Sequence, residues 1–431
     1  MALPVLLLDA GRDAAATKRT CDALLSQSVD VRVVASLHDI ESADCEFLVL
    51  ALSGVTLDVT ACERAVWFLA TRPLVTCVTG GTSPSEDATR AMQSAMQFLV
   101  IRTAVAHRLL STTDALHAAT AITLVIGVLR ATGRGAAWIS EPVIRTAADA
   151  TLLATTLDEA HAAVQQLGLA KESLIDTTAA CVPLVPQQQL MHVARPQLRV
   201  RRAPARALRV LALFQGFPMG GYTAFNADLL PRLAAAGHAI TVCTTEWWRT
   251  DWRLEQVRAA SPDIHHAHAV VPPAAVPAYV DWLIASRAID VVLLSHSHLG
   301  YHMLPYLRAR HPDVAFVDYV HTDWFETAMY GSYGAMAARW EGQLDAQLAT
   351  SHALVAQLET GGCEPDALRA AHIGIDTRTW HHCDHARPTF GHRSAPVRRH
   401  SCCCSLDVSR LKSGRISRST SRHSCWPKGT M

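Results

Sequence analysis

The chain has 431 residues, half of them apolar and 18% charged, with a mean hydropathy of +0.14. This length gives room for two to four domains of roughly 100–200 residues, and the apolar content excludes a chain that is disordered throughout. The formal net charge of +1 is unevenly spread, because residues 387–431 carry ten Lys or Arg and one acid, which leaves −8 on residues 1–386. An acidic body argues against nucleic acid as a partner.

The amino terminus and the cysteines favour a cytoplasmic protein. No basic region precedes the first apolar run, which ends at Asp9, so no signal peptide is expected. The longest strongly apolar stretch, residues 118–129, is shorter than the about 20 residues of a membrane-spanning helix, so we expect it to be buried. Eight of the twelve cysteines are scattered singly up to Cys383, which is typical of buried side chains in a reducing compartment.

Residues 1–180 alternate short apolar runs with helical patterns. Strands are expected at residues 5–10, 29–35, 45–52 and 74–80, and helices at 61–70 and 147–166. This alternation predicts a mostly parallel sheet covered by helices. Residues 181–207, rich in Pro, Gln and Arg, are predicted to form an extended linker, and the alternative for their arginines is a patch for anionic membranes.

Residues 208–380 show the same alternation more regularly. Strands are expected at residues 208–214, 239–244, 291–295, 314–320 and 368–373, and helices at 225–236, 277–286, 301–310 and 335–347. The succession predicts a Rossmann-like domain, in which ligands gather at the carboxyl ends of the strands.

A glycine pair follows the first strand of this second segment. Gly220 and Gly221 lie between the strand and a helix, where glycine lets the backbone approach a ligand and the helix N-terminus attracts anions. The alternative is a tight turn that needs a positive φ. The loop is neither a GxGxxG nor a Walker motif.

The order of several motifs resembles that of the retaining GT-B glycosyltransferases of family 4. The motifs are GGYTAFNADLLPRLAAAGHAITVCTT (220–245), IDVVLLSHSHLGY (289–301), VDYVHTDW (317–324), LDAQLATSHALVAQL (344–358) and HIGIDTRTW (372–380). The resemblance covers about residues 209–380 and implies one Rossmann-like GT-B N-terminal domain.

The resemblance also implies roles for particular residues. Gly220 and Gly221 would approach the diphosphate and sugar of the donor, and Tyr222 would also bind substrate. Ser295 and His296 would bind substrate on the acceptor side. The donor is a nucleotide-diphosphate sugar, which is a substrate, and no cofactor is expected.

His321 would contact the transferred sugar and support the transition state. An imidazole suits this work because it offers a hydrogen bond or a shared proton near neutral pH, and the alternative is a strand-end histidine with satisfied bonds. No metal site is expected at His265–His268, which lack i,i+4 spacing and a nearby carboxylate.

Residues 1–180 resemble, more weakly, the middle of a GT-A domain of glycosyltransferase family 2. Where that family carries its metal-binding acids, residues 51–54 have no carboxylate and Asp58 comes too late, and residues 118–120 lack the second acidic pair. A GT-A site without these acids cannot neutralise the leaving diphosphate through a metal. We therefore expect a degenerate, non-catalytic segment, and the alternative is an unrelated α/β module.

The basic tail shows no helix or strand period and no zinc-site spacing. Read from Arg387 in the shifted reading frame, its codons can encode a strand, a GRL…EK turn and an amphipathic helix, as expected of the donor domain of a GT-B enzyme. The sequence therefore predicts a frameshift near residues 386–387 and a disordered tail over 387–431.

These observations predict a glycosyltransferase-related protein. It would transfer a sugar, with retention, from a nucleotide-diphosphate sugar to a cell-surface polysaccharide or a glycolipid. We expect a protein that is either cytoplasmic or peripheral to the inner membrane leaflet, and no activity in this truncated chain. The alternative is a non-catalytic remnant that binds an acceptor or serves as a scaffold.

Overall fold

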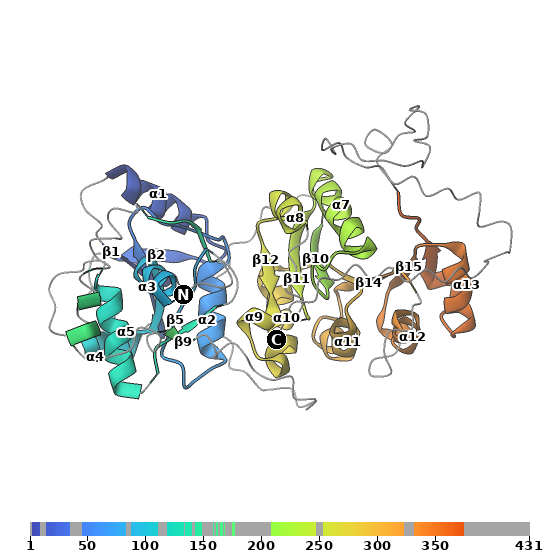
Figure 1. Ribbon diagram of the computed structural model, residues 1–431. Helices are drawn as coiled ribbons and strands as arrows, with labels where there is room; N and C mark the ends of the chain where they lie inside the picture. The colour runs from blue at the N-terminus through green and yellow to red at the C-terminus, as the bar shows by residue number, and fades with distance from the viewer. Residues whose placement is uncertain are drawn as a thin grey trace, which may run out of the picture. The chain divides into compact units, whose positions relative to one another are not determined.

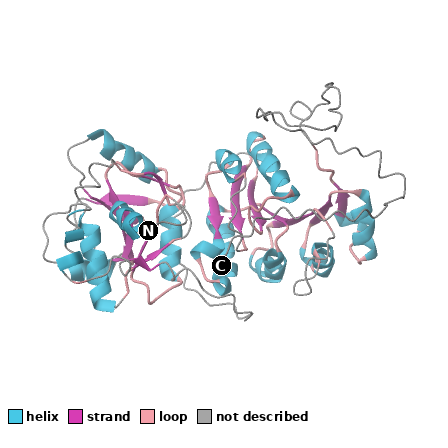
Figure 2. Cartoon of the chain, in the orientation of Figure 1, coloured by secondary structure: helices cyan, strands magenta, loops and turns pink. Residues whose placement is uncertain are grey.

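A computed structural model gives the fold of the chain (Figures 1 and 2). It describes residues 2–8, 14–34, 45–82, 88–110, 119–132, 134–139, 143–148, short pieces between 158 and 176, 208–246, 253–322 and 332–374. The predicted linker 181–207, the tail 387–431 and most of the predicted helix 147–166 lie outside these residues. The described α/β elements all belong to one compact unit, Met1–Gly374.

The first sheet has the strand order β2-β1-β3-β6-β5-β7-β9. Its strands are β1 (Leu3–Leu8), β2 (Val31–Val34), β3 (Phe47–Leu52), β5 (Cys77–Thr79), β6 (Phe98–Arg102), β7 (Ala136–Trp138) and β9 (Ile175–Asp176). The sheet is mixed, because β6 runs antiparallel to both β3 and β5 while the other pairs are parallel. A two-stranded sheet joins β4 (Thr56–Leu57) to β8 (Ile144–Thr146).

Five helices among the described residues accompany the first sheet. They are α1 (Ala14–Leu25), α2 (Ala61–Ala70), α3 (Ala88–Gln97), α4 (Thr103–Leu110) and α5 (Ala119–Thr132). The apolar stretch 118–129 forms most of α5 and is buried as predicted, with Leu124 and Val125 fully covered. Cys62 and Cys77 are also fully buried, and this burial raises the pKa of each thiol to about 12.

The second sheet is entirely parallel and has the order β12-β11-β10-β13-β14-β15-β16. Its strands are β10 (Arg209–Phe214), β11 (Ala239–Thr244), β12 (Ile264–His266), β13 (Val291–Ser295), β14 (Ala315–Val320), β15 (Ala346–Ala349) and β16 (Leu368–Ala370). The chain moves outward to one edge through β11 and β12 and then returns to the other side of β10. A Rossmann-like sheet binds ligands outside the carboxyl ends of its strands at such a reversal, here between β10 and β13.

Helices cover both faces of the second sheet (Figure 1). The helices are α7 (Gly221–Ala235), α8 (Leu254–Ala260), α9 (Ala267–Val270), α10 (Val276–Arg287), α11 (His298–Arg310), α12 (Tyr333–Arg339) and α13 (His352–Thr360), with short 3₁₀ turns at Pro273–Ala275, Glu341–Gln343 and Pro365–Ala367. Alternation along β10 divides the core, because Val210 and Ala212 pack with α7 and α8 whereas Leu211 and Leu213 pack with α10 and α11. None of the described helices is both long and apolar enough to span a bilayer.

Candidate active site

Three loops at the carboxyl edge of the second sheet hold the predicted site residues. Gly220 precedes α7 after β10, Ser295 and His296 lie at the end of β13, and His321 directly follows β14. Parallel neighbours bring these ends together. The Ser295 Oγ lies 2.8 Å from His321 Nε2, and the rings of His296 and His321 have centroids 4.9 Å apart.

The imidazole of His321 has a hydrogen-bond partner on one side and aromatic rings on others. Ser295 Oγ, which contacts His321 Nε2, also accepts a hydrogen bond from Asn226 Nδ2 at 3.0 Å. The rings of Phe225 and Tyr319 lie 5.0 Å and 4.7 Å from the imidazole. Its Nδ1 is buried and has no hydrogen-bond partner among the described residues. A buried imidazole nitrogen without a partner is available to a ligand.

His296 has an unusual backbone conformation. Its φ of +50° lies in the left-handed region, which costs a non-glycine residue about 1–3 kcal/mol and is often found at functional sites. Its carbonyl oxygen accepts a hydrogen bond from the Gln215 backbone at 3.1 Å, and its ring stacks on Tyr333 at 4.0 Å. The buried Nε2 has no hydrogen-bond partner among the described residues. The strained loop thus holds a second unsatisfied imidazole beside His321.

Tyr222 belongs to the same cluster, with its ring centroid 5.0 Å from that of His296. Its hydroxyl donates to the Gly216 carbonyl at 3.2 Å and accepts from Gln215 Nε2 at 2.9 Å. The Gln215 side chain in turn accepts from the Tyr333 hydroxyl at 2.7 Å. Burial raises the pKa of Tyr222, so this hydroxyl remains protonated.

The glycine pair opens onto free space. Gly220 is extended, with φ 172° and ψ 171°, so the alternative of a turn that needs a positive φ is wrong. A side chain added at Gly220 or Gly221 would meet no atom within 4 Å among the described residues. The loop therefore leaves room next to the N-terminus of the 15-residue helix α7.

Both histidines of the site are neutral at physiological pH. Burial, and secondarily the neighbouring imidazole, lowers the pKa of His321 to about 3. The pKa of His296 falls to about 3 through burial and the neighbouring His298. These rings therefore act as neutral hydrogen-bonding groups, and the pKa gives no support to a shared proton near neutral pH.

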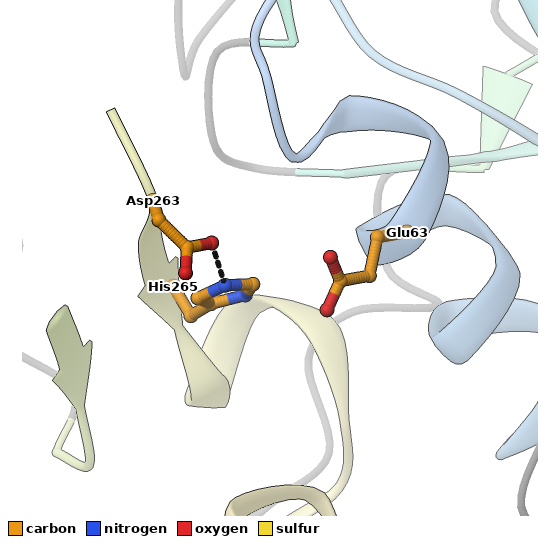
Figure 3. Close-up of side chains that lie close together, drawn as sticks. All are labelled: Glu63, Asp263 and His265. Atoms are coloured by element: carbon orange, nitrogen blue, oxygen red, sulfur yellow. Dashed lines mark hydrogen bonds and ion pairs between the residues drawn. The ribbon is translucent and has the colours of Figure 1, made fainter. Parts of the chain in front are cut away.

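A second polar cluster joins the two α/β segments. Ligand atoms of Glu63, Asp263 and His265 all lie within 4.8 Å of one another (Figure 3). The expectation that His265 has no nearby carboxylate is therefore wrong, since its Nε2 lies 2.9 Å from Asp263 Oδ1. The guanidinium of Arg287 lies among these groups, 2.6 Å from Glu63 and 2.9 Å from Asp263. Arg287 supplies the positive charge there, so the geometry favours a salt-bridge cluster over a metal site.

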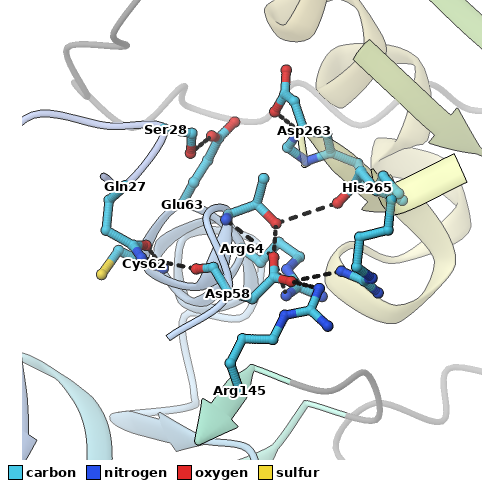
Figure 4. Close-up of polar contacts among 12 residues, drawn as sticks. Gln27, Ser28, Asp58, Cys62, Glu63, Arg64, Arg145, Asp263 and His265 are labelled. Carbon is cyan, nitrogen blue, oxygen red and sulfur yellow. Dashed lines mark hydrogen bonds and ion pairs between the residues drawn. The ribbon is translucent and has the colours of Figure 1, made fainter. Parts of the chain in front are cut away.

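Asp58 lies next to this cluster and is also committed to ion pairs (Figure 4). Its buried carboxylate lies 3.1 Å from Arg64, 2.6 Å from Arg145 and 2.7 Å from Arg258. Asp58, the first acid after residues 51–54, is therefore engaged in structural ion pairs with three arginines.

The sequence did not identify Gln215, Asn226 or Tyr333 as part of the site. Asn226 follows Tyr222 by four residues on α7, so helical periodicity places both on one face and could have indicated it. Gln215 and Tyr333 meet only through the tertiary fold, and no sequence signal marks their contact.

Fold and geometry together define the class of the second segment. It is a Rossmann-like α/β domain whose polar site lies at the carboxyl ends of β10, β13 and β14. Residues 219–379 match the family model of Glycosyltransferase Family 4, so this part of the chain is similar to that family. The match includes all six predicted site residues. No curated protein matches the chain.

Several solved structures are similar to part of the chain. HepE of Anabaena in complex with UDP-glucose is 10% identical with a TM-score of 0.30, covering 40% of this chain and 45% of its own. The lipopolysaccharide outer core galactosyltransferase WaaB is 7% identical with a TM-score of 0.28 (38% and 44%). A putative UDP-N-acetylglucosamine 2-epimerase from Listeria monocytogenes is 12% identical with a TM-score of 0.29 (38% and 45%). The chain spans less than half the length of each.

Proposed function

We propose that the family 4 domain takes part in the retaining transfer of a sugar from a nucleotide-diphosphate sugar to a cell-surface polysaccharide or glycolipid acceptor. The match to family 4 over residues 219–379 carries this proposal. The clustering of Ser295, His296 and His321 beside the open glycine loop supports it, because it places unsatisfied neutral donors and acceptors next to free space.

Each part of the site suits one part of such a substrate. The N-terminus of α7 carries the partial positive charge of the helix dipole and favours a diphosphate beside Gly220 and Gly221. The neutral imidazoles of His296 and His321 suit sugar hydroxyls, which are uncharged and both donate and accept hydrogen bonds. The aromatic faces of Tyr222 and Tyr319 flank these polar atoms.

Binding of nucleotide-sugars to the full 431-residue chain tests the proposal. A panel of UDP-glucose, UDP-galactose and GDP-mannose is titrated in by calorimetry or by saturation-transfer NMR. We expect His321→Ala to weaken binding by about five- to tenfold, the equivalent of one hydrogen bond of about 1 kcal/mol. Binding should also change little between pH 5 and 8, because the pKa of His321 lies at about 3.

His238→Ala is the matched control. His238 directly precedes β11 and so lies at the amino edge of the sheet, opposite the site, and its replacement should leave binding unchanged. If none of the nucleotide-sugars binds, or if both variants weaken binding equally, the assigned site is wrong.

The same samples address the two finer predictions. Transfer from the panel to a lipid-linked acceptor would contradict the expectation that this chain is inactive, whereas acceptor binding without transfer favours the non-catalytic alternative. A location that is either cytoplasmic or peripheral to the inner membrane leaflet also stays a prediction, which cell fractionation would test.

A further inference from the structure

A chain of hydrogen bonds leads from α7 to the imidazole of His321. Asn226 Nδ2 lies 3.0 Å from Ser295 Oγ, which lies 2.8 Å from His321 Nε2. The side chains of Asn226 and Ser295 are buried, and each comes from a different element of the second sheet's edge.

The available hydrogens determine which group donates in each of these two hydrogen bonds. An amide Nδ2 can only donate, so Ser295 Oγ accepts from Asn226. The hydrogen of the Ser295 hydroxyl then has one acceptor among the described residues, which is His321 Nε2. A nitrogen that accepts carries no hydrogen, and a neutral imidazole then bears its single hydrogen on the other nitrogen, Nδ1.

We propose that Asn226 and Ser295 are positioning residues that fix His321 in its Nδ1–H tautomer, so that this histidine presents a hydrogen-bond donor to an oxygen of the bound sugar. The identity of the ligand rests on the proposed function, whereas the tautomer is a property of the chain alone.

The surroundings of the ring fit this assignment. Burial lowers the pKa of His321 to about 3, so the imidazole is neutral and its tautomer is defined. The ring of His296 lies edge-on at 4.9 Å, while Phe225 and Tyr319 cover other sides. Thr350 Oγ1 donates to the His321 carbonyl at 3.1 Å and holds the backbone. The Nδ1 is then the polar ring atom left for a ligand.

The imidazole nitrogen shifts of the full chain test the tautomer directly. Histidine is labelled with ¹³C and ¹⁵N, and the signals of His321 among the 22 histidines are identified by their loss in His321→Gln. Without any ligand, we expect a protonated Nδ1 and an unprotonated, hydrogen-bonded Nε2. A wild-type spectrum with the proton on Nε2 would overturn the proposal.

Asn226→Asp gives the sharpest variant. The new carboxylate can only accept, so the Ser295 hydroxyl turns toward it and accepts from His321 Nε2 instead. The donors and acceptors of both hydrogen bonds are then exchanged, and the His321 tautomer should change to Nε2–H. An unchanged tautomer in a folded Asn226→Asp protein would show that Asn226 and Ser295 do not fix the tautomer of His321.

Variants at Ser295 provide a second route if Asn226→Asp does not fold. Ser295→Ala should leave a mixture of tautomers, and Ser295→Thr, which keeps the hydroxyl, should restore the Nδ1–H form. Ser26→Ala removes an exposed hydroxyl that donates to the Ala23 carbonyl in its own turn, and it should leave the His321 signals unchanged. Equal spectra for Ser295→Ala and the wild type would contradict the proposal.

Binding measurements separate this inference from the proposed function. If the tautomer assignment is correct and nucleotide-sugars bind, Ser295→Ala should lose about five- to tenfold in affinity, while Ser295→Thr retains the wild-type affinity. If no nucleotide-sugar binds but the nitrogen shifts behave as expected, the proposed function fails and the tautomer assignment stands.

Discussion

Asp318 lies on β14, three residues before His321, and its carboxyl is fully buried. The Tyr301 hydroxyl donates a hydrogen bond to it at 2.8 Å. Burial dominates over this bond and raises the pKa of Asp318 to about 7. The folded protein therefore holds a proton at Asp318 over a pH range in which the unfolded chain, with a pKa near 3.8, has released it.

This proton makes stability depend on pH. Because the folded state binds more protons between pH 4 and 7, the contribution of Asp318 to the free energy of unfolding is full below about pH 4 and is lost as the pH rises through 7. Asn cannot ionise, so Asp318→Asn should remove this dependence. The difference between the two proteins should grow by at most about 4 kcal/mol from pH 4 to pH 8 in urea unfolding.

The difference isolates Asp318 because the other titratable groups contribute equally to the wild type and to Asp318→Asn, so their contributions cancel. The pKa values of His296 and His321 are about 3 in the fold, so these residues destabilise the folded state as the pH falls from 6.5 toward 3 in both proteins. A constant difference across this range would show that Asp318 is ionised in the fold.

At this scale, the positions of the strand ends explain why three of the predicted site residues lie close together, and their role in binding or catalysis stays a prediction. Ser295, His296 and His321 follow apolar runs, so a parallel sheet places them together. The left-handed backbone of His296 and the ring of Tyr333 against it were not predictable, because strain and stacking depend on the packing of separate loops.

At the level of elements, three helices of the second segment begin with a serine N-cap. Ser297, Ser332 and Ser351 each precede a helix and accept a hydrogen bond from the backbone N–H three residues later. Such a cap satisfies one of the free donors of the first helical turn. The caps fix where α11 and α13 leave the carboxyl edge of the sheet.

Removing one cap should destabilise the domain measurably. Ser351 Oγ accepts from the Leu354 backbone at 3.1 Å at the start of α13. We expect Ser351→Ala to lower the free energy of unfolding by about 1 kcal/mol, and Ser351→Asp, which keeps an acceptor oxygen, to retain it. Urea denaturation measures both, and equal losses in the two variants would show that the hydroxyl is not acting as a cap.

Hydrophobic periodicity predicted most of the helices and strands, and it missed those whose sequences show little of this periodicity. Helix α2 has the predicted bounds, and α10 extends the predicted 277–286 by one residue at each end. The antiparallel strand β6 was missed because it follows α3 without a turn residue between them. Strand β12 is short and contains His265 and His266, so it lacks an apolar run, although both side chains are buried.

At the level of the whole molecule, the two α/β segments share a buried set of contacts. Trp67 of α2 is fully buried and meets Tyr279 and Trp282 of α10 edge-on, with ring centroids 5.0 Å and 5.3 Å apart. Arg72 donates to the Val270 carbonyl at 2.7 Å. The sequence could not predict these contacts, because they join residues about 200 positions apart and no local pattern pairs them.

A cluster of oppositely charged side chains lies at the centre of the contact between the two segments. Arg287 makes two hydrogen bonds to Glu63, at 2.6 Å and 2.7 Å, and also contacts Asp263. Burial disfavours the charged form of Arg287, yet the two carboxylates raise its pKa well above the usual value. Ser28 donates a further hydrogen bond to Glu63.

Removing Arg287 should therefore uncouple the two segments. Arg287→Met leaves Glu63 as a buried charge without its cation, which typically costs about 3–5 kcal/mol. We expect the single cooperative unfolding transition of the wild type to separate into two in calorimetry. Arg253→Met is the matched control, because Arg253 pairs with the half-exposed Asp228 at 3.5 Å, an interaction worth about 1 kcal/mol or less.

The double variant Glu63→Gln/Arg287→Met distinguishes a specific ion pair from general damage to the contact. Neutralising Glu63 removes the unpaired charge that Arg287→Met creates, so the double variant should be more stable than Arg287→Met alone. Asp263, which is partly exposed and accepts from Thr241 at 2.7 Å, needs no such compensation. If Arg287→Met loses no more stability than Arg253→Met and still unfolds in one transition, the segments are held together by the apolar contacts of Trp67 and the ion pair contributes little.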